Sequence, residues 1–142
     1  MIHIVDVQYY TVGKETVLKE ACMFPFGHPC QRKYFAFRTD IAPLTVKDQR
    51  TSKYLYHQLG LLHWKEGKAS VEGFTFRPGS ILLCNGLEKS LFLKSLFPLC
   101  IVLNCNLSLP FIHMECPTRP HKQCALSKAM SLYHALIHKQ ND

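Results

Sequence analysis

The first 38 residues contain three strand-like segments with only short turns between them. Residues 2–12 are rich in β-branched and aromatic side chains, and a Gly-Lys turn at positions 13–14 leads into residues 16–24, which have the same character. A turn with two prolines and a glycine, at positions 25–29, precedes residues 33–38, whose apolar side chains divide between two faces. This order predicts three consecutive antiparallel strands.

The middle of the chain contains one helix signal and one stretch without a clear pattern. Thr45 and Asp48 form a capping box, with Asp in place of the usual Glu, and predict a helix over residues 45–59 that ends before a glycine. Residues 61–78 have no periodicity that separates a helix from irregular structure. The large aromatic residues of this stretch are expected to be buried: Trp64, Phe74 and Phe76.

Strand and helix patterns alternate in the last part of the chain. Residues 80–84 and 99–103 are short apolar runs, typical of strands covered on both faces, and residues 87–97 carry apolar side chains at helical spacing. One face of a closing helix is marked by Leu126, Met130, Tyr133 and Ile137. We therefore predict a single α/β domain over residues 1–142, with a mixed sheet of three antiparallel strands and two further strands, flanked by helices.

The chain is basic and has an odd number of cysteines. Lys and Arg number 17 and Asp and Glu number 10, which gives a formal charge of +7. This charge favours polyanionic partners such as nucleic acid, although a solvated basic surface explains it as well. The seven cysteines favour a reducing compartment. With neither a signal peptide nor a membrane-spanning run at its start, we expect the chain to be intracellular, cytoplasmic or nuclear, without a membrane partner.

Three local motifs carry a resemblance to a known family. The first strand contains Asp6-Val-Gln8, Lys89 follows four residues after an Asn that ends a strand, and Lys128 lies two residues after an Ala-Leu pair. This pattern resembles the ribonuclease H-like core of DEDDh exonucleases over nearly the whole chain. The resemblance implies that Gln8 stands where the family has a Glu, and that Lys89 and Lys128 stand where it has Asp residues. Of the family's carboxylates only Asp6 remains.

The missing carboxylates bear directly on nuclease activity. Two-metal hydrolysis needs carboxylates that hold two divalent ions about 4 Å apart. One Asp and one amide beside two lysines do not supply them, and Glu88, next to Lys89, points roughly 100° away around the helix. We therefore expect no catalytic residues. The alternative is an active nuclease with a nonstandard metal site.

A group of soft metal ligands precedes the last helix. Cys116, His121 and Cys124 supply two thiols and an imidazole within nine residues, around a proline-containing turn. These are the ligand types that zinc prefers, although the spacing is not that of a standard zinc finger. The alternative is that Cys124 is a buried thiol at a helix start and Cys116 a loop cysteine.

A fourth ligand is needed for a tetrahedral zinc site. The group is similar to that of the Maelstrom domain, another ribonuclease H-like family, in which Glu, His and Cys bind zinc and the exonuclease carboxylates are lost. The resemblance implies Glu20 as the fourth ligand and zinc as a structural cofactor. Glu115, His28 and Cys30 are the rival candidates.

Basic residues at the former catalytic positions, Lys89 and Lys128, and others expected on the same face suggest a binding role. Lys89, Lys128 and Arg38 can hold a phosphate backbone without cutting it, although solvated helix positions explain such lysines equally well. The expected partner is nucleic acid, single-stranded RNA in particular, with a protein partner also possible. A pure protein-interaction module in RNA silencing or host–virus interplay is the other alternative. Tyrosines in alternating strands are more often core residues than base-stacking residues.

Overall fold

The structure, a computed structural model, describes residues 1–12, 15–38, 50, 67–118 and 120–141. The predicted turn at residues 13–14, the predicted helix over residues 45–59 apart from Arg50, and the predicted burial of Trp64 lie outside these residues. Among the described helices, none is long and apolar enough to cross a membrane.

A five-stranded mixed sheet forms the centre of the described structure, in the order β3-β2-β1-β4-β5. Its strands are β1 (Ile2–Val12), β2 (Glu15–Pro25), β3 (Lys33–Ala36), β4 (Ile81–Cys84) and β5 (Ile101–Asn104). The first three strands are antiparallel neighbours, whereas β4 runs parallel to both β1 and β5. The predicted mixed sheet of three antiparallel strands and two further strands is confirmed.

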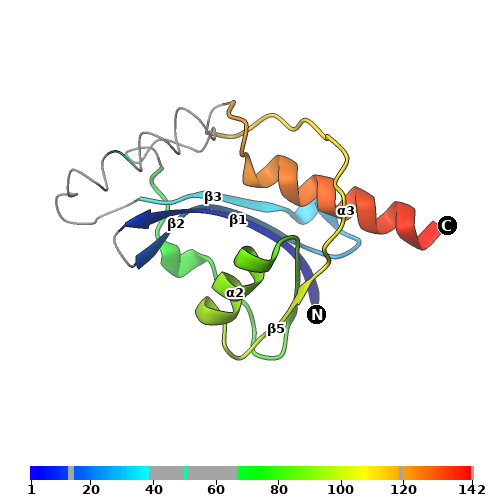
Figure 1. The fold of residues 1–142 in the computed structure, drawn as a ribbon, viewed down its shortest axis with the longest axis horizontal. Coiled ribbons are helices and arrows are strands. Elements are labelled where there is room, and N and C mark those ends of the chain that lie inside the picture. The colour runs from blue at the N-terminus through cyan, green and yellow to red at the C-terminus, as the bar shows by residue number, and fades with distance from the viewer. Residues whose placement is uncertain (13–14, 39–49, 51–66, 119, 142) are drawn as a thin grey trace.

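Two helices cover opposite faces of this sheet. In Figure 1, α3 (Ala125–Asn141) lies along one face and α2 (Leu87–Leu96) lies against the other. The short 3-10 helices η1 (Pro29–Gln31) and η2 (Val71–Gly73) lie in the connections. Two of the three predicted helices, over residues 87–97 and from about residue 126, are confirmed.

The alternation of side chains along β1 divides the core into two layers. Ile4 packs with Phe24 of β2 and with buried residues of α3, whereas Val5 and Val7 pack with Leu93 of α2. Asp6 and Gln8 therefore point to the α3 face. Because the register pairs Asp6 with Cys22 and Gln8 with Glu20, these polar side chains share that face with Glu20.

The predicted burial is borne out on one side of the sheet and wrong on the other. Phe74 is buried and Phe76 is half-buried in the layer under α2. In β5, however, only Val102 is buried, and Ile101 and Leu103 are 52% and 48% exposed. The run over residues 99–103 is not a strand covered on both faces, because β5 is the last strand of the sheet and the side chains it points toward the α3 face are only partly covered.

Residues 105–116 connect β5 to the start of α3 in an extended path. The side-chain amide of Asn85 bonds to both the N–H and the carbonyl of Leu107, at 2.8 and 3.1 Å. Near the other end, the backbone N–H of Met114 donates to the hydroxyl of Ser127 in α3 at 3.1 Å. These hydrogen bonds at its two ends hold the connection along the α3 face, so that Cys116 lies near the start of α3.

Candidate metal centre and the Asp6 cluster

Four side chains that are distant in sequence meet where α3 begins. Glu20 projects from β2, Cys116 ends the 105–116 connection, His121 lies in the turn that follows, and Cys124 immediately precedes α3. One ligand atom from each lies within 4.8 Å of the others. The structure thus brings together all four residues that the sequence and the Maelstrom resemblance suggested, and the cluster can hold a metal ion.

Glu20 is fixed in place by both of its carboxylate oxygens. Oε1 accepts a hydrogen bond from the backbone N–H of Ala125 at 3.0 Å, and Oε2 lies 2.9 Å from Nε2 of His121. The Ala125 N–H is at the first turn of α3, where the helix dipole favours a negative charge. The side chains of His121 and Glu20 are 1% and 0% exposed, so the pair is shielded from water.

The cluster fits a tetrahedral zinc ion in ligand type and spacing. Ligand atoms about 2.0–2.3 Å from one tetrahedral ion lie roughly 3.3–3.8 Å from each other, a separation that small side-chain movements within the 4.8 Å cluster can reach. Two sulfurs, one imidazole nitrogen and one carboxylate oxygen are all zinc ligands. Burial raises the pKa of Cys124 to about 12, so this thiol is protonated without a metal and zinc binding must displace its proton.

Two further residues lie at this site and were not predicted from the sequence. The hydroxyl of Tyr34, on β3, lies 3.4 Å from Sγ of Cys116. Its pKa is raised by burial and by the negative charge of Glu20, so it stays a neutral hydrogen-bonding group. Cys22 lies two residues from Glu20 on the same face of β2, and burial together with the charge of Asp6 raises its pKa. No spacing in the sequence indicates that β3 and β2 approach the Cys116 turn.

The rival fourth ligands lie elsewhere. Glu115 is exposed, and His28 and Cys30 are exposed residues in the turn between β2 and β3. None of them belongs to the group of four found among the described residues. Glu20 therefore remains the candidate for the fourth place.

A second polar cluster surrounds Asp6 on the same face of the sheet. Nζ of Lys89 lies 2.7 Å from Oδ1 of Asp6, and the Gln8 amide donates to Oδ2 at 3.1 Å. The strand β4 pairs with β1 only at residues 2–4, which leaves the edge of β1 at Asp6 open to Lys89 from the first turn of α2. Gln8 and Lys89, two of the three positions at which the resemblance implies a lost carboxylate, thus contact Asp6.

Lys128 adds a second positive charge to the Asp6 cluster. Burial raises the pKa of Asp6, and the nearby charges of Lys89 and Lys128 oppose that shift. Burial and the charge of Lys89 lower the pKa of Lys128, with Asp6 opposing. The structure records no ion pair for Lys128 among the described residues. The Asp6 carboxylate thus acts on both lysines, and it forms its ion pair with Lys89.

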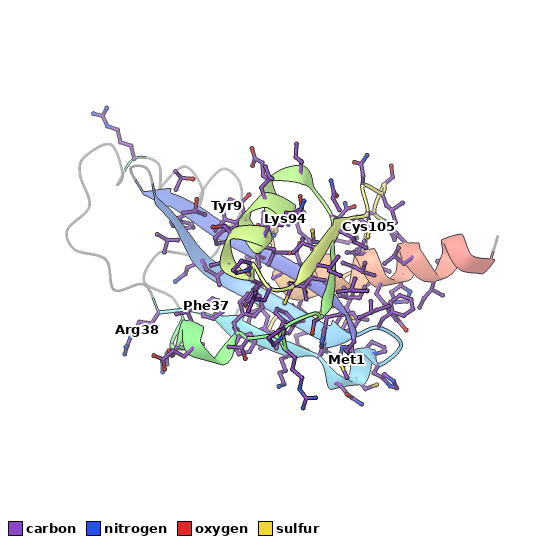
Figure 2. The ribbon with its side chains drawn as sticks, turned by 90° about the horizontal axis from the view of Figure 1, so that it is seen from below. Met1, Tyr9, Phe37, Arg38, Lys94 and Cys105 are labelled. Atoms are coloured by element: carbon purple, nitrogen blue, oxygen red, sulfur yellow. The ribbon has the colours of Figure 1, made fainter. Side chains whose placement is uncertain are left out.

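Glu88 extends away from Asp6, and Arg38 lies apart from this cluster. Glu88 extends toward Tyr9, whose hydroxyl lies 3.5 Å from Glu88 Oε2, in keeping with its expected rotation away from Asp6 around the helix. Arg38 follows β3, two strands from β1, and its exposed side chain extends outward (Figure 2). Of the three predicted basic residues, Lys89 and Lys128 thus lie beside Asp6, whereas Arg38 lies on another part of the surface.

Comparison of the chain with protein-family models, with curated proteins and with solved structures finds no match in any of the three.

Proposed function

We propose that this chain is a ribonuclease H-like domain related to DEDDh exonucleases that has lost nuclease activity, is stabilised by zinc, and binds single-stranded RNA. The order of strands and helices supports the fold assignment, since three antiparallel strands are followed by alternating helices and parallel strands. The lysines beside Asp6, the single acidic residue of the three motifs, support the loss of nuclease activity and the binding of RNA. The four-residue cluster at Glu20 supports the zinc site.

The observation that carries the proposal is the contact between Lys89 and Asp6. Lys89 Nζ lies 2.7 Å from Oδ1 of Asp6 and the Gln8 amide donates to Oδ2, so both carboxylate oxygens have partners that a metal ion would have to displace. A magnesium ion beside Asp6 would also meet the charge of Lys128 and the neutral amide of Gln8. Electrostatic repulsion and the lack of a second carboxylate both oppose the two-metal arrangement that hydrolysis requires.

The zinc site of the proposal is structural. Glu20, Cys116, His121 and Cys124 would hold one ion and fill all four tetrahedral positions, which leaves no open position for an activated water. When bound, the ion supplies stability by joining β2 and the 105–116 connection to the start of α3. The residues themselves exclude water, because His121 and Glu20 are almost fully buried.

The RNA-binding part of the proposal rests on charge. The chain has a formal charge of +7, and Lys128 places a half-buried ammonium near the Lys89–Asp6 pair. An RNA phosphate there would pair with Lys128, and the cations condensed around that phosphate would be released. The resemblance to exonucleases that act on strand ends favours a single strand.

Fluorescence anisotropy with a labelled single-stranded RNA, measured between 50 and 200 mM salt, tests this function. We expect binding without cleavage and an affinity that falls steeply with salt. Lys128→Met should lower the slope of log affinity against log salt by about one. Arg77→Met, which removes one charge at the opposite end of β4, is the matched control. Absence of RNA binding at 50 mM salt would refute the RNA-binding function.

A further inference from the structure

A hollow of about 620 Å³ lies between the β1–β2 hairpin and α2. Its wall includes Tyr9 and Thr16 from the two strands and Glu88, Leu91, Phe92 and Ser95 from α2. Figure 2 shows Tyr9 beside α2, on the side of the sheet that this helix covers. A volume of this size is within the range of small-molecule sites, which span about 300–1,000 Å³.

The wall combines aromatic rings with one carboxylate. The rings of Tyr9 and Phe92 pack edge to face with centroids 4.9 Å apart, and Leu91 nearby is 56% exposed. The Tyr9 hydroxyl reaches Glu88 Oε2 only at the long distance of 3.5 Å. Burial and the charge of Glu88 raise the pKa of Tyr9, so the hydroxyl keeps its proton. Glu88 is exposed and can accept shorter hydrogen bonds from a ligand.

The hollow adjoins the Asp6 cluster. Glu88 is the chain neighbour of Lys89, which contacts Asp6, and the charge of Asp6 acts on the Tyr9 hydroxyl. A ligand with a phosphate near Lys89 and Lys128 can therefore extend an attached group into the hollow. That group is not a second phosphate, because the Glu88 carboxylate would repel it.

We propose that this hollow binds a guanine base of the RNA whose phosphate rests on Lys89 and Lys128. The proposal rests on the RNA-binding function above and names its base preference. Guanine presents two adjacent donors, N1–H and the 2-amino group, which match the two oxygens of a carboxylate such as that of Glu88. Adenine, cytosine and uracil each place an acceptor next to their donor, and this acceptor would face a carboxylate oxygen. The Tyr9 and Phe92 rings and the Leu91 side chain supply the apolar surface on which a base packs.

The test compares short oligouridylates that carry a single central guanosine, inosine or adenosine. We expect the guanosine strand to bind about tenfold more tightly than the adenosine strand, with inosine between them because it lacks the 2-amino donor. Glu88→Gln should reduce the guanosine preference to about onefold and keep the salt dependence. Glu72→Gln, which neutralises an exposed carboxylate on η2, should keep the preference.

The outcomes separate this inference from the proposed function. Equal affinity for the three strands, or a preference that survives Glu88→Gln, overturns the guanine site and leaves RNA binding intact. If no strand binds, the proposed function fails, and binding of a base to the hollow is then tested with guanosine monophosphate and adenosine monophosphate. Shifts of the Tyr9 and Phe92 ring NMR signals with guanosine monophosphate alone would then support the site, and their absence would overturn it.

Discussion

Lys89 and Asp6 are 83 positions apart in sequence, and yet Nζ of the lysine lies 2.7 Å from Oδ1 of the aspartate. The lysine comes from the first turn of α2 and reaches Asp6 past the short strand β4. A positive side chain thus occupies the side of Asp6 on which a metal-binding centre would need another carboxylate. The four side chains of the described structure that could hold a metal ion gather around Glu20, on the neighbouring strand.

We expect no metal-dependent nuclease activity. Single-stranded RNA and DNA incubated with the protein and Mg²⁺ or Mn²⁺ should remain intact, because Asp6 alone cannot hold two ions. Gel electrophoresis of end-labelled strands is the measurement. Cleavage that requires the metal and disappears in Asp6→Ala would establish an active enzyme and contradict this prediction.

Zinc should copurify with the protein at about one ion per chain. Elemental analysis of protein prepared without added metal measures this content, and chelation should lower Tm by about 10 °C or more because the ion joins three segments of the fold. Cys124→Ser should lose most of the zinc. Cys22→Ser is the matched control, since Cys22 is equally buried and lies beside the site without belonging to the four ligands.

Tyr34 should tune zinc affinity without binding the metal. Tyr34→Phe removes the hydroxyl that lies 3.4 Å from Cys116 Sγ, and loss of such a hydrogen-bond partner typically weakens metal binding about 10-fold to 100-fold. Competition with a chromophoric chelator gives the affinity. Tyr133→Phe, which changes a buried tyrosine in the core under α3, should leave the affinity unchanged. Equal effects of the two variants would point to a general packing role for Tyr34.

Lys128→Met should raise Tm while it weakens RNA binding. The pKa of Lys128 is lowered by burial and by Lys89, so the protonated side chain destabilises the folded state. This cost is complete below the lowered pKa and disappears as the pH rises to the ordinary value of 10.5. Thermal melts at pH 7 and pH 10.5 should therefore show an advantage of the variant at the lower pH that is absent at the higher one.

Lys89→Met should have the opposite effect on stability. It leaves the buried Asp6 carboxylate without its ion-pair partner, and breaking a buried pair in this way costs about 3 kcal/mol. Chemical unfolding of the two variants at pH 7 measures both changes. A loss of stability of similar size in Lys128→Met would show that Lys128 is a structural residue.

The sequence was sufficient for the elements of the sheet and insufficient for their exposure. Alternation and turn residues predicted the first three strands and short apolar runs predicted the last two, because those signals are local. The exposure of Ile101 and Leu103 depends on which strand lies at the edge of the sheet, and no local pattern in an apolar run reports strand order.

The residues of the candidate site, too, could be predicted from the sequence only in part. Cys116, His121 and Cys124 are close in sequence and were visible from their spacing, whereas Glu20 came from a family resemblance and is joined to them only by the fold. Tyr34 has no sequence signal at all, because its contact with Cys116 spans 82 residues. The hollow beside Glu88 was likewise invisible, since it depends on how α2 packs against the hairpin.

A crystal structure with anomalous diffraction data collected on both sides of the zinc absorption edge tests the central claim most directly. We expect one zinc peak, about 2.0–2.3 Å from ligand atoms of Glu20, Cys116, His121 and Cys124, and the ammonium of Lys89 against Asp6. A crystal without the zinc peak, or with a metal ion bound to Asp6, would contradict the account.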